Sequence, residues 1–146
     1  MDYKTVESNI KKIIEESSNI LQDVVNYLSN NIDHYSWVGI YVVEGKDLVL
    51  GPWNGPDETK HTRIPIGQGV CGSAASSGKT EVVDDVHKDS RYLSCFVSTK
   101  SEIVVPIKKD GKIAGEIDID SDKISAFTND DKVFLEKICD MLSEHI

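Results

Sequence analysis

The stretch SEIVVPIKKDGKIAGEIDIDS, residues 101–121, predicts two β-strands that pair as an antiparallel hairpin. Both halves alternate β-branched and polar residues as strand positions do, and Asp110-Gly111 between them is a common hairpin turn. This pair could close a two-residue turn, which would set Val105 opposite Glu116. A three-residue loop with Gly111 in the left-handed region would instead shift the pairing by one residue.

The register of this hairpin decides which side chains share a face of the sheet. With the three-residue loop, Ile103, Val105 and Ile107 lie opposite Ile117, Gly115 and Ile113. Only this register separates an apolar face from an acidic one, because a slip of one residue turns every side chain of a strand to the other face. We therefore expect the three-residue loop.

Four carboxyl groups would then share the second face of the hairpin. Glu102 is expected opposite Asp118, with Glu116 and Asp120 on the same face. One interpretation is a solvated outer surface, since Asp and Glu are mostly exposed. Like charges directly across a sheet are destabilising and Asp is a poor strand residue, so we favour a pocket. Such a pocket could bind a cation such as an ammonium group, or could hold a protonated carboxyl group that donates a hydrogen bond.

Length and composition restrict the kinds of protein that the chain can be. The 146 residues suit one domain with a single core, and 25 acidic against 16 basic residues give a net charge of −9. This charge argues against nucleic acid and against an anionic membrane surface as partners. No apolar run approaches the ~20 residues that span a bilayer, and the N-terminus has no signal-peptide pattern. Three cysteines without a CxxC motif fit a reducing cytoplasm, which is the predicted location.

Helical patterns flank the predicted sheet. Apolar residues recur at spacings of three and four over about 3–31, which predicts one long amphipathic helix. Thr128-Asn129-Asp130-Asp131 has the form of a capping box and opens a second helix over about 129–145. We expect one α+β domain, residues 1–146. Residues 35–121 would form an antiparallel sheet and a pocket, and both terminal helices would pack on one face of the sheet. The apolar stripe of the first helix is long, so we also expect a symmetric homodimer through the terminal helices.

An aromatic strand precedes the hairpin. Residues 36–43, SWVGIYVV, place Trp37, Gly39 and Tyr41 on one face, where Gly39 leaves space between the two rings. On residue type alone, the simplest interpretation is that both aromatics are ordinary core residues. A second strand, residues 48–51, follows this one as a hairpin, and a polar loop is expected from Pro52 to His61.

The segment Gly67-Gln68-Gly69-Val70-Cys71-Gly72 matches the GxGxxG pattern of dinucleotide-binding proteins. The strand before it is short and contains Pro65, and the helix after it, about 72–77, has barely two turns. A dinucleotide fold needs a buried parallel strand and a full helix, so we interpret the glycines as a tight turn at the mouth of a pocket. This turn would place Cys71 at a helix N-terminus, a position that lowers the pKa of a thiol.

The other two cysteines differ in their surroundings. Cys95 lies within residues 84–99, a polar segment without a clean period, directly before the acidic hairpin. A lone cysteine is usually a small buried hydrophobe, but the polar neighbours of Cys95 favour exposure and reactivity. Cys139 falls on the apolar side of the C-terminal helix and is expected to be structural. The four histidines show no metal-ligand spacing, so no metal site is predicted.

The order of helix, antiparallel strands, loop-rich middle and closing helix resembles the GAF domain. Several motifs look more specifically like the free methionine-(R)-sulfoxide reductases, enzymes of GAF fold that reduce the free amino acid rather than protein-bound residues. These motifs are Trp37-x-Gly39-x-Tyr41, Leu48-x-Leu50-Gly51-Pro52, Ile64-Pro65-x-Gly67-x-Gly69-Val70-Cys71-Gly72-x-Ala74-Ala75, Asp85-Val86-His87, Cys95, Ser101-Glu102-Ile103-Val104-x-Pro106 and Asp118-Ile119-Asp120-Ser121.

The resemblance implies a role for each residue that matches a family position. The nucleophile is Cys95, the acidic pocket residues are Glu102, Asp118 and Asp120, and the aromatic wall around the substrate is Trp37 and Tyr41.

The reaction implied by this resemblance reduces free L-methionine-(R)-sulfoxide. The Cys95 thiolate attacks the sulfoxide sulfur while a neutral carboxyl group protonates the departing oxygen, which leaves methionine and a sulfenic acid. A second thiol then condenses with the sulfenic acid, and an external dithiol such as thioredoxin resets the enzyme, so no bound cofactor is expected.

Two departures from the family pattern leave other functions open. The family usually carries a cysteine ten residues before Cys71, where this chain has His61, so recycling falls to Cys71 or to a small thiol from solution. Residues 89–94, DSRYLS, resemble instead the GAF domains of signalling proteins, which bind small molecules without chemistry. A ligand-binding module and a dimerisation module with an unused pocket are therefore the two alternatives.

Overall fold

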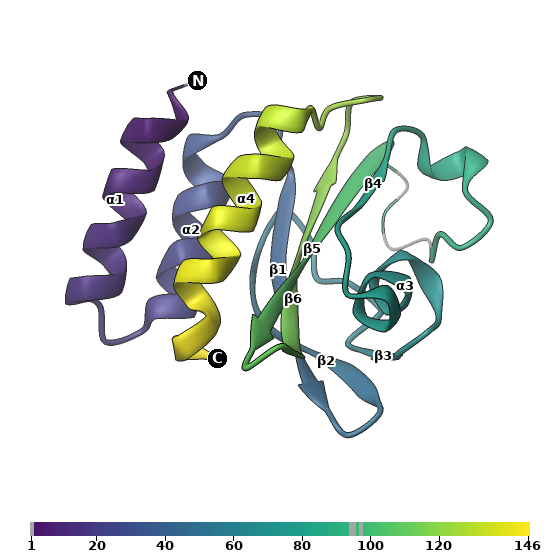
Figure 1. Ribbon diagram of the computed structural model, residues 1–146. Coiled ribbons are helices and arrows are strands. Elements are labelled where there is room, and N and C mark those ends of the chain that lie inside the picture. Colours follow the sequence, from purple (N-terminus) through teal and green to yellow (C-terminus); the bar gives the residue numbers. More distant parts are fainter. Residues whose placement is uncertain (1, 94–95, 97) are drawn as a thin grey trace.

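A six-stranded antiparallel sheet forms the centre of the computed structural model, which describes residues 2–93, 96 and 98–146. The strands are β1 (Trp37–Glu44), β2 (Asp47–Asn54), β3 (Arg63–Pro65), β4 (Glu81–Val83), β5 (Ser101–Lys109) and β6 (Lys112–Ser121), in the spatial order β3-β2-β1-β6-β5-β4. The helices are α1 (Tyr3–Glu16), α2 (Ile20–Asn31), α3 (Gly69–Ser77) and α4 (Asn129–Leu142), with short 3₁₀ helices η1 (Val86–Lys88) and η2 (Ser143–His145). Helices α1, α2 and α4 lie on one side of the sheet and α3 on the other, which confirms the predicted α+β architecture (Figure 1).

The β5–β6 hairpin closes with a two-residue turn, so the predicted three-residue loop is wrong. Lys109 pairs with Lys112, and the two residues between them, Asp110 and Gly111, have φ angles of 54° and 77°. Positive φ at both positions is the type I′ turn, whose twist matches that of the flanking strands.

A β-bulge next to this turn restores the separation of the two faces. Ile107 pairs with Gly115, but Lys108 pairs with Ile113, so Ala114 is an extra residue on β6. The bulge moves the pairing by one residue, as bulges do. The acidic and apolar faces are therefore separated as predicted, although the predicted partners are wrong.

The observed pairs on the acidic face differ from the expected ones by two residues along β6, so the same face is presented but each residue has a different partner. Glu102 lies opposite Asp120 rather than Asp118, which lies opposite Val104, and Glu116 lies opposite Pro106. On the other face, the apolar pairs are Ile103 with Ile119, Val105 with Ile117 and Ile107 with Gly115.

The predicted long N-terminal helix is two helices, because the chain turns at Ser17-Ser18-Asn19. The Ser17 hydroxyl donates a hydrogen bond to Asp23 (Oγ to Oδ2, 2.6 Å) and accepts one from the backbone N–H of Asn19 (2.9 Å). Serine and asparagine side chains compete for backbone hydrogen bonds in this way, which favours turns over helix interiors. Within the described residues, no helix is both long and apolar enough to cross a membrane.

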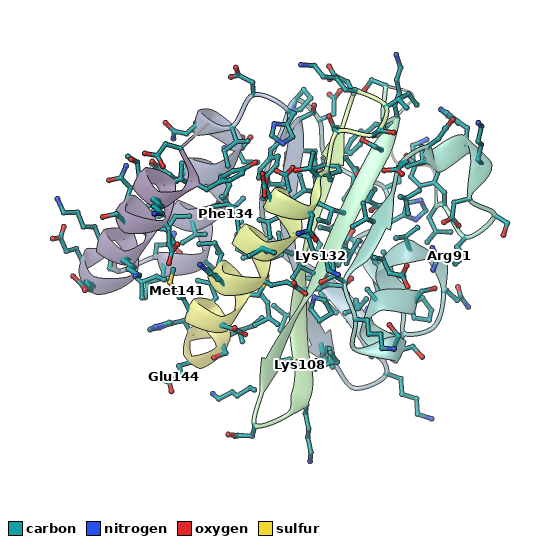
Figure 2. The ribbon with its side chains drawn as sticks, turned by 45° about the horizontal axis from the view of Figure 1, so that its top comes forward. Arg91, Lys108, Lys132, Phe134, Met141 and Glu144 are labelled. Atoms are coloured by element: carbon teal, nitrogen blue, oxygen red, sulfur yellow. The ribbon has the colours of Figure 1, made fainter. Side chains whose placement is uncertain are left out.

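The apolar stripe that predicted one helix packs against the rest of the chain, and most of its residues are buried, while Ile13, Ile14 and Leu21 are half-buried. Helix α1 packs on α2 and α4, and these two cover the sheet. Figure 2 shows Phe134 and Met141 on α4 beside the N-terminal helices, and the Phe134 ring stacks on Tyr3 of α1 with a centroid distance of 4.5 Å. The expected homodimer stays a prediction.

Asp131 joins three segments of the helical layer. The capping box is confirmed: the Asp131 carboxylate accepts a hydrogen bond from the backbone N–H of Thr128 (2.9 Å). It also accepts hydrogen bonds from the hydroxyls of Tyr3 and Tyr35 and lies 2.9 Å from Nε2 of His34. Burial alone would raise the pKa of Asp131, but these hydrogen bonds outweigh burial and hold its pKa well below the ordinary value.

We predict that Asp131→Asn lowers the free energy of unfolding by about 2–3 kcal/mol at pH 7, because hydrogen bonds to a carboxylate are lost. A lowered pKa gives stability that is present above the unfolded-state pKa of about 4 and is lost as the pH falls towards the folded-state pKa. The difference between wild type and Asp131→Asn in urea unfolding should therefore shrink from pH 5 to pH 2. The exposed neighbour supplies the matched control, Asp130→Asn, and an equal loss in both variants would contradict the role of Asp131.

Candidate functional site

The acidic face of the central hairpin is buried beneath α3. Glu102, Glu116, Asp118 and Asp120 are 5%, 0%, 4% and 3% exposed, respectively. The solvated outer surface, one of the two interpretations of the sequence, is therefore wrong. The predicted pocket residues lie together on one face of β5 and β6.

Helix α3 covers this face because a glycine-rich turn brings it close to the sheet edge. It begins at Gly69, three residues earlier than predicted, so Cys71 lies in its first turn. A Cβ atom at Gly72 would lie only 2.8 Å from the carbonyl oxygen of Pro65, a distance that side chains do not allow. The glycine at position 72 thus allows α3 to pack closely against the β3 edge, a use of the GxGxxG segment beyond the predicted tight turn at the mouth of a pocket.

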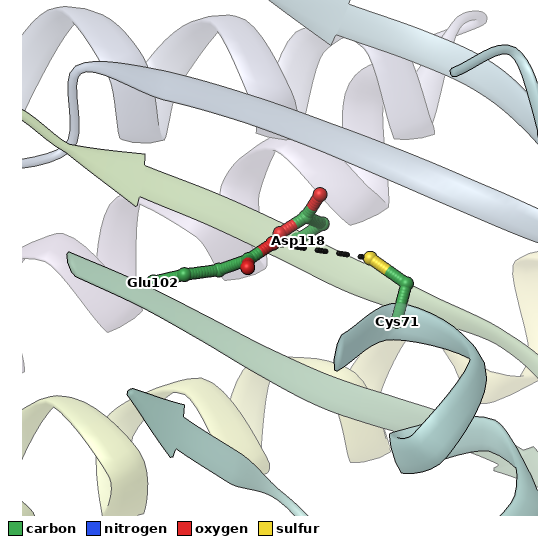
Figure 3. Close-up of side chains that lie close together, drawn as sticks. All are labelled: Cys71, Glu102 and Asp118. Atoms are coloured by element: carbon green, nitrogen blue, oxygen red, sulfur yellow. Dashed lines mark hydrogen bonds between the residues drawn. The ribbon is translucent and has the colours of Figure 1, made fainter. Parts of the chain in front are cut away.

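The Cys71 thiol points from α3 towards the carboxyl groups on the hairpin (Figure 3). Its Sγ donates a weak hydrogen bond to Oε2 of Glu102 at 3.9 Å. One ligand atom each of Cys71, Glu102 and Asp118 lie within 4.8 Å of one another.

The predicted lowering of the Cys71 pKa is wrong. Burial, and then the negative charges of Asp118, Glu116 and Glu102, raise the pKa of this thiol well above its ordinary value. Desolvation and three nearby carboxyl groups outweigh the partial positive charge of the helix N-terminus. Cys71 is therefore a protonated thiol at neutral pH.

The carboxyl groups have few partners of their own. Both side-chain oxygens of Glu116 and one each of Asp118 and Asp120 are buried without a hydrogen-bond partner among the described residues. Burial raises the pKa of all three, and the charge of Asp118 raises those of Glu116 and Asp120 further. None of the ion pairs in the described part of the chain includes these three groups. The cluster therefore holds protons at neutral pH, or it needs a cation from outside the chain.

The two predicted aromatic residues lie beside this cluster on β1. Tyr41 and Trp37 are both buried, and the Tyr41 hydroxyl donates a hydrogen bond to the carbonyl oxygen of His61 at 2.6 Å. The Trp37 ring lies directly over Gly39, where a Cβ atom would be 2.3 Å from the ring. Gly39 thus makes room for the Trp37 ring.

Two aromatic residues that the sequence did not predict extend this wall. Trp53 stacks on Trp37 with a centroid distance of 6.3 Å, and Phe96 lies 5.9 Å from Trp37. The predicted loop over 52–61 is wrong at its start, because β2 continues through Pro52 to Asn54 and pairs Trp53 with Gly39. The alternation of Leu48, Leu50 and Pro52 could have revealed the longer strand, but a proline usually ends one.

A small cavity lies between α3 and the hairpin. Its lining residues are Tyr41, Ile64, Val70, Cys71, Leu93, Glu102 and Asp118. Its free volume of about 10 Å³ matches a single water molecule or ion. Four predicted site residues thus meet at one cavity, and Asp120 and Trp37 form a facing pair next to it across β6 and β1.

The predicted nucleophile, Cys95, lies outside the described residues, as do Met1, Ser94 and Val97. The described residues on either side of it belong to the site: Leu93 lines the cavity, and Phe96 packs near Trp37.

Comparisons with known proteins confirm the resemblance to the GAF domain and to the free methionine-R-sulfoxide reductases. The GAF domain family matches residues 16–146. A free methionine-R-sulfoxide reductase of Escherichia coli is 34% identical over 117 residues, which cover 80% of this chain and 70% of that protein.

Two solved structures are similar over nearly the whole chain. A type II free methionine-R-sulfoxide reductase from Thermoplasma acidophilum is 39% identical, with a TM-score of 0.84 over 90% of this chain and 93% of that one. A free methionine-R-sulfoxide reductase from Neisseria meningitidis, in complex with its substrate, is 33% identical, with a TM-score of 0.91 over 97% and 86% of the two chains.

We predict that Glu116→Met raises the free energy of unfolding by about 1–3 kcal/mol at pH 7, because a buried carboxyl group without a hydrogen-bond partner costs stability. Methionine has a similar unbranched shape and leaves no polar atom unpaired. Urea unfolding at pH 7 measures the change, and Glu144→Met on exposed η2 is the control. A Glu116→Met protein less stable than wild type would show that the carboxyl group has a stabilising partner.

Proposed function

The chain belongs to the GAF-domain family of free methionine-(R)-sulfoxide reductases, and we propose that it reduces free L-methionine-(R)-sulfoxide to methionine at the expense of external thiols. The observation that carries this proposal is three buried carboxyl groups, Glu116, Asp118 and Asp120, that form no ion pair among the described residues and lie beside an aromatic wall and a thiol. Free amino acids carry an ammonium group, whereas a methionine inside a protein chain does not.

Each part of the substrate has a matching surface in this site. Glu102, Asp118 and Asp120 would bind the ammonium group, because charge-assisted hydrogen bonds would compensate for the hydration that the carboxylates lose on burial. Trp37 and Tyr41 would hold the apolar side chain, which carries the sulfoxide. The requirement for a free ammonium group would select the free amino acid over methionine sulfoxide residues inside a protein chain.

Substrate entry requires the cavity to widen, since its free volume matches only one water molecule. Leu93 is the lining residue on the loop side of the cavity, and it packs on Gly69 at the start of α3. Arg91, in the same loop, is held by Asp89 and by Glu81 of β4. We infer that Leu93 moves outward while the Arg91 contacts hold the base of the loop.

The chemistry begins with Cys95 as nucleophile. Its thiolate attacks the sulfoxide sulfur. Either Asp118 or Glu102, whichever keeps a proton while the other acids bind the ammonium group, protonates the departing oxygen. The substrate sulfur gains two electrons and leaves as methionine, while the Cys95 sulfur loses two electrons and keeps the oxygen as a sulfenic acid.

Cys71 is the best candidate among the described residues to resolve this sulfenic acid. Its sulfur would form a disulfide with Cys95, and the sulfenic oxygen would leave as water with the Cys71 proton. An external dithiol of the thioredoxin type then reduces the disulfide. The second thiol of the described residues, Cys139, is buried in the helical layer and donates to the carbonyl oxygen of Val105 at 3.6 Å.

A ligand-binding module without chemistry is the second candidate. The closed cavity and the high pKa of Cys71 favour it, since a sensor needs only the carboxyl and aromatic residues. A symmetric homodimer and a cytoplasmic location remain part of the proposal and rest on the sequence.

We predict that Cys95→Ser abolishes reduction of free methionine-(R)-sulfoxide, because serine cannot carry the two-electron step. Stability should hardly change. Cys139→Ser, the matched control, should keep the activity but lose ~1 kcal/mol of stability as a buried polar substitution. Turnover with dithiothreitol measures the first effect and urea unfolding the second, and full activity in Cys95→Ser would refute the reductase mechanism.

We also predict that Asp118→Asn weakens binding of the free amino acid by about 2–5 kcal/mol, because a buried charge-assisted contact loses one partner. Asp122→Asn replaces an exposed carboxylate just beyond β6 and should leave binding unchanged. Calorimetry with substrate on the Cys95→Ser background measures both without turnover. Equal affinities in the two variants would mean that Asp118 does not bind the ammonium group.

A further inference from the structure

We propose that the cavity under α3 binds a divalent transition-metal ion, Zn²⁺ above all, through Cys71 Sγ and one carboxylate oxygen each of Glu102 and Asp118. The ion would occupy the site in place of the amino acid and would block it. Nothing in the histidine or cysteine spacing of the sequence predicted such a site, because its three ligands come from three separate elements, α3, β5 and β6.

The geometry is close to that of a zinc site. The three candidate atoms lie within 4.8 Å of one another, and Cys71 Sγ is already 3.9 Å from Glu102 Oε2. Tetrahedral Zn²⁺ with ordinary Zn–S and Zn–O bond lengths sets its ligand atoms roughly 3.5 Å apart. Binding would therefore require the three side chains to move their ligand atoms closer together than they lie in this structure.

A second observation points to a cation rather than to a group of acids alone. Oδ1 of Asp118 is buried and has no hydrogen-bond partner among the described residues, and Asp118 lines the cavity. The free volume of about 10 Å³ admits one ion and no larger ligand without movement of the loop. Oδ1 of Asp120, the next residue along the same face, is equally without a partner, so a further carboxylate lies near the three ligands.

The ligand set favours zinc over the other common divalent ions. Ca²⁺ and Mg²⁺ need six or more oxygen ligands, whereas two carboxylates and a thiolate match the low coordination number and mixed ligands of Zn²⁺. The fourth position would take water or Asp120. Binding exchanges the Cys71 proton for the metal, with no change of oxidation state: the S–H bond breaks, the S–Zn bond forms and a proton leaves to solvent.

The inhibitory consequence rests on the proposed function. Zn²⁺ would take two of the three carboxylates assigned to the ammonium group, Glu102 and Asp118, and the thiol assigned to the resolving step. Inhibition should therefore be competitive with the amino acid and should be reversed by a chelator. The metal site itself does not depend on any activity.

The test is a titration of the reduced, untagged full chain with Co²⁺, which occupies zinc sites and shows a near-ultraviolet charge-transfer band when a thiolate binds it. We expect the band to saturate at one equivalent in wild type and in Cys139→Ser, the matched buried-thiol control. It should be absent in Cys71→Ser, and the affinity should fall at least about tenfold in Asp118→Asn and in Glu102→Gln. Added Zn²⁺ should bleach the band. Circular dichroism checks that each variant is folded.

Absence of the band in wild type, its persistence in Cys71→Ser or its loss in Cys139→Ser would overturn the proposal. Unchanged affinity in both carboxylate variants would do so as well, because the ion would then be bound elsewhere. Assays of methionine-(R)-sulfoxide reduction with and without Zn²⁺ keep the two proposals apart. A Cys71-dependent band in a protein without reductase activity would leave the metal site and remove the function, whereas activity without a band would do the reverse.

Discussion

Burial of three carboxyl groups, Glu116, Asp118 and Asp120, without an ion-pair partner among the described residues is the constraint on which the rest of this structure depends. Together with Glu102 they lie on one face of a central hairpin, which α3 covers. Removing such groups from water costs several kcal/mol each if they remain charged, so they hold protons or a cation occupies the site. A fold that keeps them buried needs stability from elsewhere, and the opposite face of the same sheet supplies it. There α2 and α4 cover the isoleucines and valines of β1, β5 and β6 in a continuous core.

Two aspartates show how position alone decides what a carboxyl group does. Asp131 sits at a helix start and accepts hydrogen bonds from Thr128, Tyr3 and Tyr35, which lower its pKa and make it a structural anchor. Asp118 has the same side chain, but burial raises its pKa and one of its oxygens has no partner among the described residues. Within the described residues, this oxygen forms no hydrogen bond that would stabilise the fold. A positively charged ligand could interact with it, which is why the site fits an ammonium group or a metal ion.

Much of the fold and site follows from the sequence because alternation along a strand is a local property. The two faces of residues 101–121, the aromatic positions Trp37 and Tyr41 and the capping box at Thr128 needed no tertiary information. The exact pairing of the hairpin could not be predicted, because a two-residue turn with a bulge at Ala114 gives the same face separation as a three-residue loop. The break between α1 and α2 at Ser17-Ser18-Asn19 was not predicted, because the apolar pattern continues through it. The predicted second strand was too short because a loop was expected to start at Pro52. The predicted shift of the Cys71 pKa was wrong in sign. The sequence shows that Cys71 lies near a helix start, but it does not show the three carboxyl groups that face the thiol.

The most direct measurement of the central claim, that a thiol beside this buried acidic site reduces a free amino acid sulfoxide, is intact-protein mass spectrometry after one equivalent of free methionine-(R)-sulfoxide without reductant. We predict that methionine is formed and that the protein loses the mass of two hydrogens, since Cys71 and Cys95 would join in a disulfide if their Cα atoms approach within about 7 Å. A gain of one oxygen would keep the reductase but would assign recycling to a small thiol instead of Cys71. An unchanged protein mass together with unreacted sulfoxide would contradict the enzyme and would leave a ligand-binding module.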